Sequence, residues 1–188
     1  TLLGNDAGKS LTTAASNVII GKNAGLAKTS GSNATIIGTS AGRDTASGSF
    51  VVLVGSEAGI SNTGDSAIAI GFEAGRVNTA NNTISIGQQA GYSQTSGTKN
   101  TNLGYQAGYS NSTGNSNVYM GYEAGQGSTT GFQNVAIGVN ALDTVANKFT
   151  NTAVGYQTGR YVVANANTFV GANACLLYTS PSPRDGRE

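Results

Sequence analysis

The segment TNLGYQAG, Thr101–Gly108, contains the repeated motif from which the fold is predicted. It reads as a β-branched residue, any residue, an aliphatic residue, Gly, two further residues, Ala and Gly. The motif recurs eleven times, and its first glycines are spaced 16 or 17 residues apart. These first glycines are Gly4, Gly21, Gly38, Gly55, Gly71, Gly87, Gly104, Gly121, Gly138, Gly155 and Gly171. Since self-similarity at a fixed short period is typical of solenoids, each repeat predicts one coil.

Each position of the repeat predicts a local role. The residue before the first Gly is always aliphatic, and the residue two places earlier is always β-branched. Because side chains alternate along a strand, we expect both to face the core and the residue between them to face outward. The Ala predicts a tight inward corner, and the Gly after it predicts backbone with positive φ. The polar second half of each repeat predicts a second short strand and a turn.

These features predict an all-β fold over residues 1–174, a parallel β-solenoid or β-roll of about eleven coils of 16–17 residues. Helical periodicity is absent from the sequence. Coils stacked about 4.8 Å apart would form a rod roughly 50 Å long.

The composition excludes several classes of function. Charged residues make up only 10% of the chain, against about 25% in an average domain, and the net charge is +1. This balance offers no basic surface for nucleic acid. The sequence has no His and one Cys, which excludes a zinc site or a His-based triad. No apolar run approaches the roughly 18 residues of a membrane-spanning helix. We therefore expect no catalysis, no metal and no cofactor.

Residues 175–188 do not follow the repeat. This stretch holds the single cysteine, Cys175, and both prolines, Pro181 and Pro183. Its sequence looks like the conceptual translation of a sequencing-library adapter, which would make the chain a truncated metagenomic reading frame. We expect this tail to be non-native and to pack against nothing.

The segments NVAIGVNAL (Asn134–Leu142) and NTAVGYQTG (Asn151–Gly159) resemble head repeats of trimeric autotransporter adhesins of the YadA type. The segment GYQAGYSNSTG (Gly104–Gly114) is similar to repeats of phage tail-fibre proteins, which often end in an endosialidase-type chaperone. The resemblance covers residues 1–174, although the adhesin repeat is shorter, at about 14 residues. It implies a left-handed β-roll with three chains in one fibre. No chaperone domain is visible in this sequence.

A parallel homotrimer is also expected because each coil supplies few inward apolar side chains. The strand position expected to face outward is often apolar and would supply the interface. The apolar residues at that position are Leu2, Ile19, Ile36, Leu53, Tyr119 and Phe169.

Four tyrosines form the candidate ligand-binding site. Tyr92, Tyr105, Tyr109 and Tyr122 flank the same turn in neighbouring coils and predict an aromatic patch on one edge. Such a patch suits contact with sugar or a receptor, and it equally suits subunit packing or exposed turns.

Three further residue patterns also have a structural alternative. Glu57 and Glu73 occupy equivalent turn positions and could pair as glycosidase carboxylates, although that position is generally polar. A threonine ladder could bind ice, but it also suits any solenoid; it comprises Thr12, Thr29, Thr63, Thr79, Thr95 and Thr129. An asparagine ladder is expected to stabilise the stack; it comprises Asn100, Asn117, Asn134, Asn151 and Asn167.

The leading hypothesis is a structural or adhesive segment of a phage tail fibre or bacterial surface adhesin. Its location would be the virion tail or the cell surface, and its partners would be further copies of itself and a host-surface glycan or receptor. The alternative is a solenoid that recognises glycan or ice along one face, and a more remote alternative is a glycan-cleaving tailspike.

Overall fold

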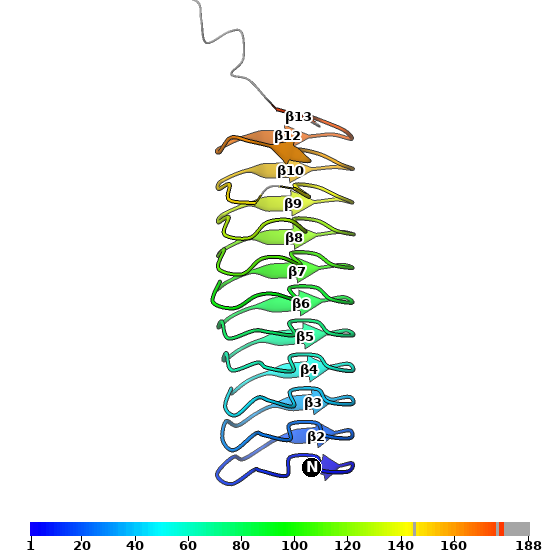
Figure 1. Ribbon diagram of the computed structural model, residues 1–188, viewed down its shortest axis with the longest axis vertical. Coiled ribbons are helices and arrows are strands. Elements are labelled where there is room, and N and C mark those ends of the chain that lie inside the picture. The colour runs from blue at the N-terminus through cyan, green and yellow to red at the C-terminus, as the bar shows by residue number, and fades with distance from the viewer. Residues whose placement is uncertain (145, 176, 179–188) are drawn as a thin grey trace, which may run out of the picture.

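The computed structural model describes residues 1–144, 146–175 and 177–178, and the chain forms a parallel β-solenoid of about ten turns (Figure 1). Each turn takes about 17 residues, and no helix occurs among the described residues. The predicted fold class and repeat are confirmed.

Eleven short strands stack into one parallel sheet, in which each strand pairs with the next strand at the equivalent motif position. The strands are β1 (Leu2–Leu3), β2 (Val18–Ile20), β3 (Thr35–Ile37), β4 (Val52–Val54), β5 (Ile68–Ile70), β6 (Ile84–Ile86), β7 (Thr101–Leu103), β8 (Val118–Met120), β9 (Val135–Ile137), β10 (Thr152–Val154) and β12 (Thr168–Val170). The register gives every coil the same cross-section, because each motif position stacks on itself.

The second strand predicted for each repeat is wrong for most coils. Over the described residues the polar half of the repeat consists of turns and bends, except for β11 (Tyr161–Val162). Its backbone still bonds to the following coil, as where Thr12 N–H donates to Thr29 C=O at 3.1 Å. Backbone bonding between coils therefore continues around the turn without strand geometry.

The predicted direction of the strand side chains is also wrong. The middle residue of the strand points inward, and the two residues flanking it point outward. Middle residues that are at most 2% exposed are Ile19, Ile36, Leu53, Ala69, Ser85, Asn102, Tyr119, Ala136 and Ala153. Phe169 packs against this core, and Leu2, in the end strand, is exposed.

The flanking residues are half-buried or exposed, although one flanking column is aliphatic throughout and the other holds only Val, Ile and Thr. Ile70, Leu103 and Met120, for example, are 37–38% exposed. The core accepts variable middle residues because the turn alanine and glycine fill part of the cross-section. The proposed trimer stripe of Leu2, Ile19, Ile36, Leu53, Tyr119 and Phe169 is thus largely core.

The turn predictions are confirmed. The alanines after the first glycine are buried, from Ala24 to Ala141. The second glycines have φ between 53° and 61°, and even Leu142 in this column has φ 49°. The first glycines also have positive φ, and a Cβ on Gly71 would lie 2.6 Å from the carbonyl oxygen of Gly87. Only glycine lets the next coil approach at this position.

The asparagine ladder is confirmed inside the stack. The side-chain oxygen of Asn100 accepts the backbone N–H of Asn117, and Asn117, Asn134 and Asn151 repeat this bond with the following coil. Each bond is 2.9–3.0 Å long. The ladder satisfies backbone donors that the strand does not reach.

The C-terminal segment joins the stack at two residues. Strand β13 (Leu177–Tyr178) pairs with β11 in parallel, so the expectation that residues 175–188 pack against nothing is wrong for these two. Residues 179–188 lie outside the described residues, and the adapter origin of the tail stays a prediction.

Candidate functional site

The four candidate tyrosines form two stacks, each between adjacent coils. Tyr105 and Tyr122 follow the first glycines, and their ring centroids lie 5.0 Å apart at an interplanar angle of 15°. Tyr92 and Tyr109 follow the second glycines, with centroids 4.9 Å apart at 13°. The structure therefore brings the four together in pairs, one pair on each side of the turn.

Stacking limits how these rings could meet a sugar. In each pair one ring face covers the other, and the Arg76 guanidinium lies over the Tyr92 ring, 5.5 Å from its centroid. A sugar usually packs its C–H groups on an open aromatic face. Stacking therefore leaves a glycan at most one open face of each ring, besides the ring edges and hydroxyls, and the glycan site stays a prediction.

Polar side chains between the two stacks are bonded to one another. Gln89 donates to the Glu73 carboxylate at 2.8 Å, and Gln106 donates to Gln89 at 2.8 Å. Gln126 continues this ladder by donating to Gln106 at 2.5 Å. These hydrogen bonds connect adjacent turns. Glu73, Gln89 and Gln106 have φ values of 50–56°, so each adopts the same left-handed conformation in its own coil.

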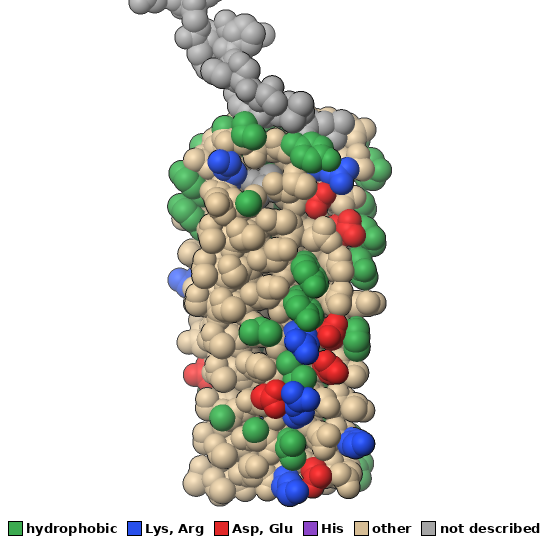
Figure 2. Space-filling view, in the orientation of Figure 1, with side chains coloured by type: hydrophobic (Ala, Val, Ile, Leu, Met, Phe, Trp, Pro, Cys, Tyr) green, Lys and Arg blue, Asp and Glu red, His purple; other side chains and the backbone are tan. Residues whose placement is uncertain are grey.

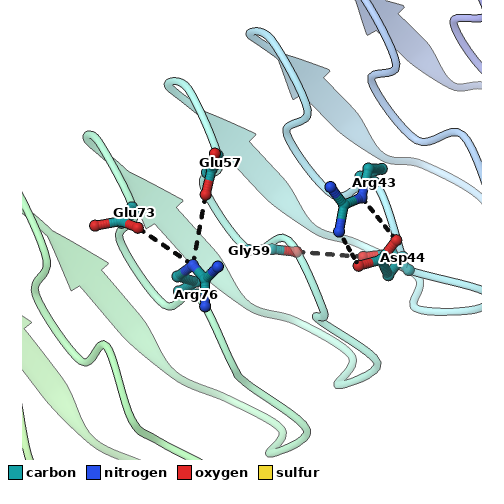
Figure 3. A network of polar contacts seen from close by, with 7 residues as sticks. Arg43, Asp44, Glu57, Gly59, Glu73 and Arg76 are labelled. Atoms are coloured by element: carbon teal, nitrogen blue, oxygen red, sulfur yellow. Dashed lines mark hydrogen bonds and ion pairs between the residues drawn. The ribbon is translucent and has the colours of Figure 1, made fainter.

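The two candidate carboxylates share one cation. Arg76 Nε lies 3.5 Å from Glu57 and 3.3 Å from Glu73, so the guanidinium bridges consecutive coils (Figure 3). Arg43 and Asp44 form a neighbouring bidentate pair with bonds of 2.9 and 2.8 Å. The arrangement suits structural ion pairing between coils, and the absence of catalysis stays a prediction.

These ion pairs belong to a charged stripe along the rod. Figure 2 shows blue and red side chains gathered beside one another, with hydrophobic ones between them. The pairs are Lys9–Asp6, Arg43–Asp44, Arg76 with Glu57 and Glu73, and Arg160–Asp143. Because four cations alternate with five carboxylates in these pairs, the stripe is not dominated by charge of one sign.

The threonine ladder is poorly suited to ice. Thr12 and Thr29 donate their hydroxyls to the carbonyls of Thr29 and Ala46, at 3.0 and 3.1 Å. Thr79, Thr95 and Thr129 do the same with the following coil. Hydroxyls already bonded to backbone are less able to order a lattice of water.

The sheet face is the surface that sequence reasoning missed. We use this name for the outward columns that flank the middle residue of strands β2 to β10 and β12. The first column is Val18, Thr35, Val52, Ile68, Ile84, Thr101, Val118, Val135, Thr152 and Thr168. The second column is Ile20, Ile37, Val54, Ile70, Ile86, Leu103, Met120, Ile137, Val154 and Val170. The face carries no charged residue, and its only polar residues are threonines.

No group of three or more His, Cys, Asp or Glu that could hold a metal ion occurs among the described residues. In the same part of the chain, no helix is long and apolar enough to cross a membrane. Cys175 is a free thiol.

Comparison with protein-family models, with curated proteins and with solved structures found no match to this chain.

Proposed function

We propose that this chain is a structural segment of a fibre, either a phage tail fibre or a bacterial surface adhesin, without catalytic activity. The observation that supports this proposal most is the constant register of eleven parallel strands. A rod of this kind gains length by repetition and stiffness from bonds between coils. Binding of a host glycan or receptor would take place at an end of the fibre or at its turns.

The proposed working unit is a parallel homotrimer joined through the sheet face. A strip about 50 Å long and about 12 Å wide covers roughly 600 Å² of each chain. The largest exposed apolar patch on a typical monomer is about 300–600 Å². The strip lies at the upper end of that range, carries no charge and runs the length of the rod, which supports an interface there. It replaces the stripe expected from the sequence.

Sedimentation equilibrium of the full chain tests the association. We expect a trimer at micromolar concentration, and a monomer for Val54→Lys, which places an ammonium on the sheet face. The control Thr113→Lys adds the same charge at an exposed position in the polar half of the repeat and should remain trimeric. A soluble, folded monomer for the unsubstituted chain would exclude this assembly.

A glycan array tests the tyrosine contact separately. Loss of signal in the double variant Tyr105→Ala and Tyr122→Ala, with an unchanged circular dichroism spectrum, would support glycan recognition. An unchanged array would leave the stacks with a purely structural role.

A polysaccharide-cleavage assay tests the absence of catalysis. This part of the proposal would be contradicted if the unsubstituted chain released reducing ends from a polysaccharide and the Glu57→Gln variant did not.

The full reading frame would decide between the two kinds of fibre. A C-terminal chaperone domain would favour a phage tail fibre, and a membrane-anchor domain would favour an adhesin.

A further inference from the structure

The two tyrosine stacks place oxidisable rings next to each other at a fixed spacing. Each pair comes from the same motif position in adjacent coils, with centroids 4.9 or 5.0 Å apart and planes within 15° of parallel. Equivalent ring atoms are therefore separated by about one coil spacing, ~4.8 Å. None of the four side chains is buried, and Tyr122 is 48% exposed. An oxidant in solvent can thus reach both members of a pair.

We propose that the Tyr92–Tyr109 and Tyr105–Tyr122 stacks are sites of dityrosine formation by hydrogen peroxide and an enzyme of the haem-peroxidase class. Each phenol gives one electron to the peroxidase and one proton to solvent, and becomes a phenoxyl radical. The two radicals join through a new carbon–carbon bond between ring positions ortho to the oxygens. Each coupled carbon then transfers its hydrogen to the phenolic oxygen, which restores both rings. Two tyrosines and one hydrogen peroxide thus give one dityrosine and two waters.

The stacks favour coupling within the chain over coupling between chains. A radical on Tyr92 has the Tyr109 ring beside it, because both side chains extend from rigid, hydrogen-bonded turns. Tyr156 supplies an internal comparison. It occupies the same motif position as Tyr105 and Tyr122 and is 51% exposed, but the equivalent residues in adjacent coils are Val139 and Ala172. If exposure alone decided reactivity, Tyr156 would couple at least as readily.

A link of this kind would fasten one coil to the next. It would close a loop of 17 residues covalently, the spacing that separates the members of each pair. As with a disulfide, such a closure restricts the unfolded chain and would raise the melting temperature.

The proposal is tested by treating the dilute full chain with peroxidase and hydrogen peroxide. Chains that carry no covalent link to another chain are then isolated under denaturing conditions, digested with trypsin and analysed by mass spectrometry. Cleavage after Arg76, Lys99 and Lys148 leaves Tyr92 in peptide 77–99. Peptide 100–148 holds the other three stacked tyrosines together with the buried Tyr119. We expect these two peptides to be joined with loss of two hydrogens. We also expect a loss of two hydrogens within peptide 100–148, from the Tyr105–Tyr122 pair.

Phenylalanine variants identify the coupled pairs, because they keep the ring but remove the phenol. Tyr109→Phe should abolish the link between peptides 77–99 and 100–148 and keep the link within 100–148, whereas Tyr105→Phe should do the reverse. A link from Tyr92 that survives in Tyr109→Phe would overturn the proposal. So would coupling confined to covalent dimers, or coupling at Tyr156 as extensive as at the stacked pairs.

Discussion

The two glycine positions of the repeat serve different physical roles, although Leu142 and Cys175 replace the second glycine in two repeats. The first glycine lets successive coils come into backbone contact, since a Cβ on Gly71 would meet the Gly87 carbonyl. The second glycine adopts a left-handed conformation beside the middle residue of the strand. The room for a Cβ at the second glycine depends on that middle residue. A Cβ on Gly125 would lie 2.6 Å from Cγ of Tyr119, whereas a Cβ on Gly75 would lie 3.3 Å from Cβ of Ala69.

Gly125→Ala should therefore destabilise the chain more than Gly75→Ala. Both variants place alanine at a φ of 53–61°, at a cost of about 1–2 kcal/mol. Only Gly125→Ala also drives a methyl group into the Tyr119 ring, which adds about 1–3 kcal/mol of overpacking. Urea denaturation of both variants measures the difference in their free energies of unfolding. Equal midpoints would show that the Tyr119 ring moves aside for the methyl group without loss of stability.

Lys28 is a charged residue placed inside the coil. Its side chain is fully buried, and its ammonium donates to the Gly48 carbonyl at 2.8 Å. Burial lowers the pKa of Lys28 below its ordinary value of 10.5, and the charge of Asp65 opposes this shift only in part. The folded chain therefore releases this proton at a lower pH than the unfolded chain does.

The stability of the unsubstituted chain should accordingly rise with pH as Lys28 loses its proton. Between the folded pKa and 10.5 the unfolded state binds more protons, so the free energy of unfolding increases by at most about 1.4 kcal/mol per pH unit. Urea denaturation from neutral pH to about pH 10 should show this rise in the unsubstituted chain relative to Lys28→Met. Parallel pH profiles for the two proteins would contradict the assignment to Lys28.

Each coil after the first contributes one three-residue strand to the long sheet, and the inward and outward sides of that strand could not be told apart from the sequence. The alternation of sides was predictable, because period two is a property of the strand itself. Which side faces inward was not predictable, since Ile36 in the middle and Ile37 beside it are equally apolar. The narrow interior accepts Ala69 or Ser85 as well as Ile36, whereas one outward column is aliphatic throughout and the other holds only Val, Ile and Thr.

The turn positions were partly predictable for a similar reason. Glycine at a repeated position indicates positive φ directly, and the structure agrees. The left-handed residues Glu57, Gln106 and Asn140 gave no such signal, because their types occur widely in turns. The spacing of the tyrosines in the sequence was enough to predict that they flank the turn. Their division into two stacks depends on side-chain directions that spacing does not contain.

Asn117→Ala tests the ladder that joins one element to the next. The buried Asn117 side chain accepts the N–H of Asn134 at 2.9 Å and donates to the Gly131 carbonyl at 2.8 Å. Its removal would leave both backbone groups without these partners, at about 1–3 kcal/mol each. We expect a total loss of about 2–4 kcal/mol by urea denaturation. Asn115→Ala, at an exposed position, is the control. A similar loss of stability in the two variants would show that the asparagine ladder does not stabilise the stack.

At the scale of the whole molecule, the apolar core is divided into two clusters. The first includes Ile19, Ile36 and Leu53 and ends at Ala74, and the second begins at Ala107 and includes Tyr119 and Leu142. Between them the buried side chains are mostly polar, apart from Ala80 and Ala90. Asn102 donates to Gln94 at 3.2 Å, and the buried side-chain oxygen of Asn102 accepts no hydrogen bond within the described residues. Burial of apolar surface, the main stabilising term, is therefore weakest in the middle of the rod.

Native-state hydrogen exchange should reveal this division. In a solenoid each coil is stabilised by its own contacts and by contacts with its two neighbours. A coil of low stability therefore lets the parts of the rod on either side of it unfold as separate cooperative units. We expect amides of β6 and β7 to exchange with a lower free energy than those of β3 and β9. Asn102→Leu removes the unpartnered amide oxygen and adds apolar surface, so it should raise the protection of β6 and β7 toward that of their neighbours. A single exchange free energy from β2 to β10 in the unsubstituted chain would show that backbone bonding between coils, rather than the apolar core, sets the cooperative unit.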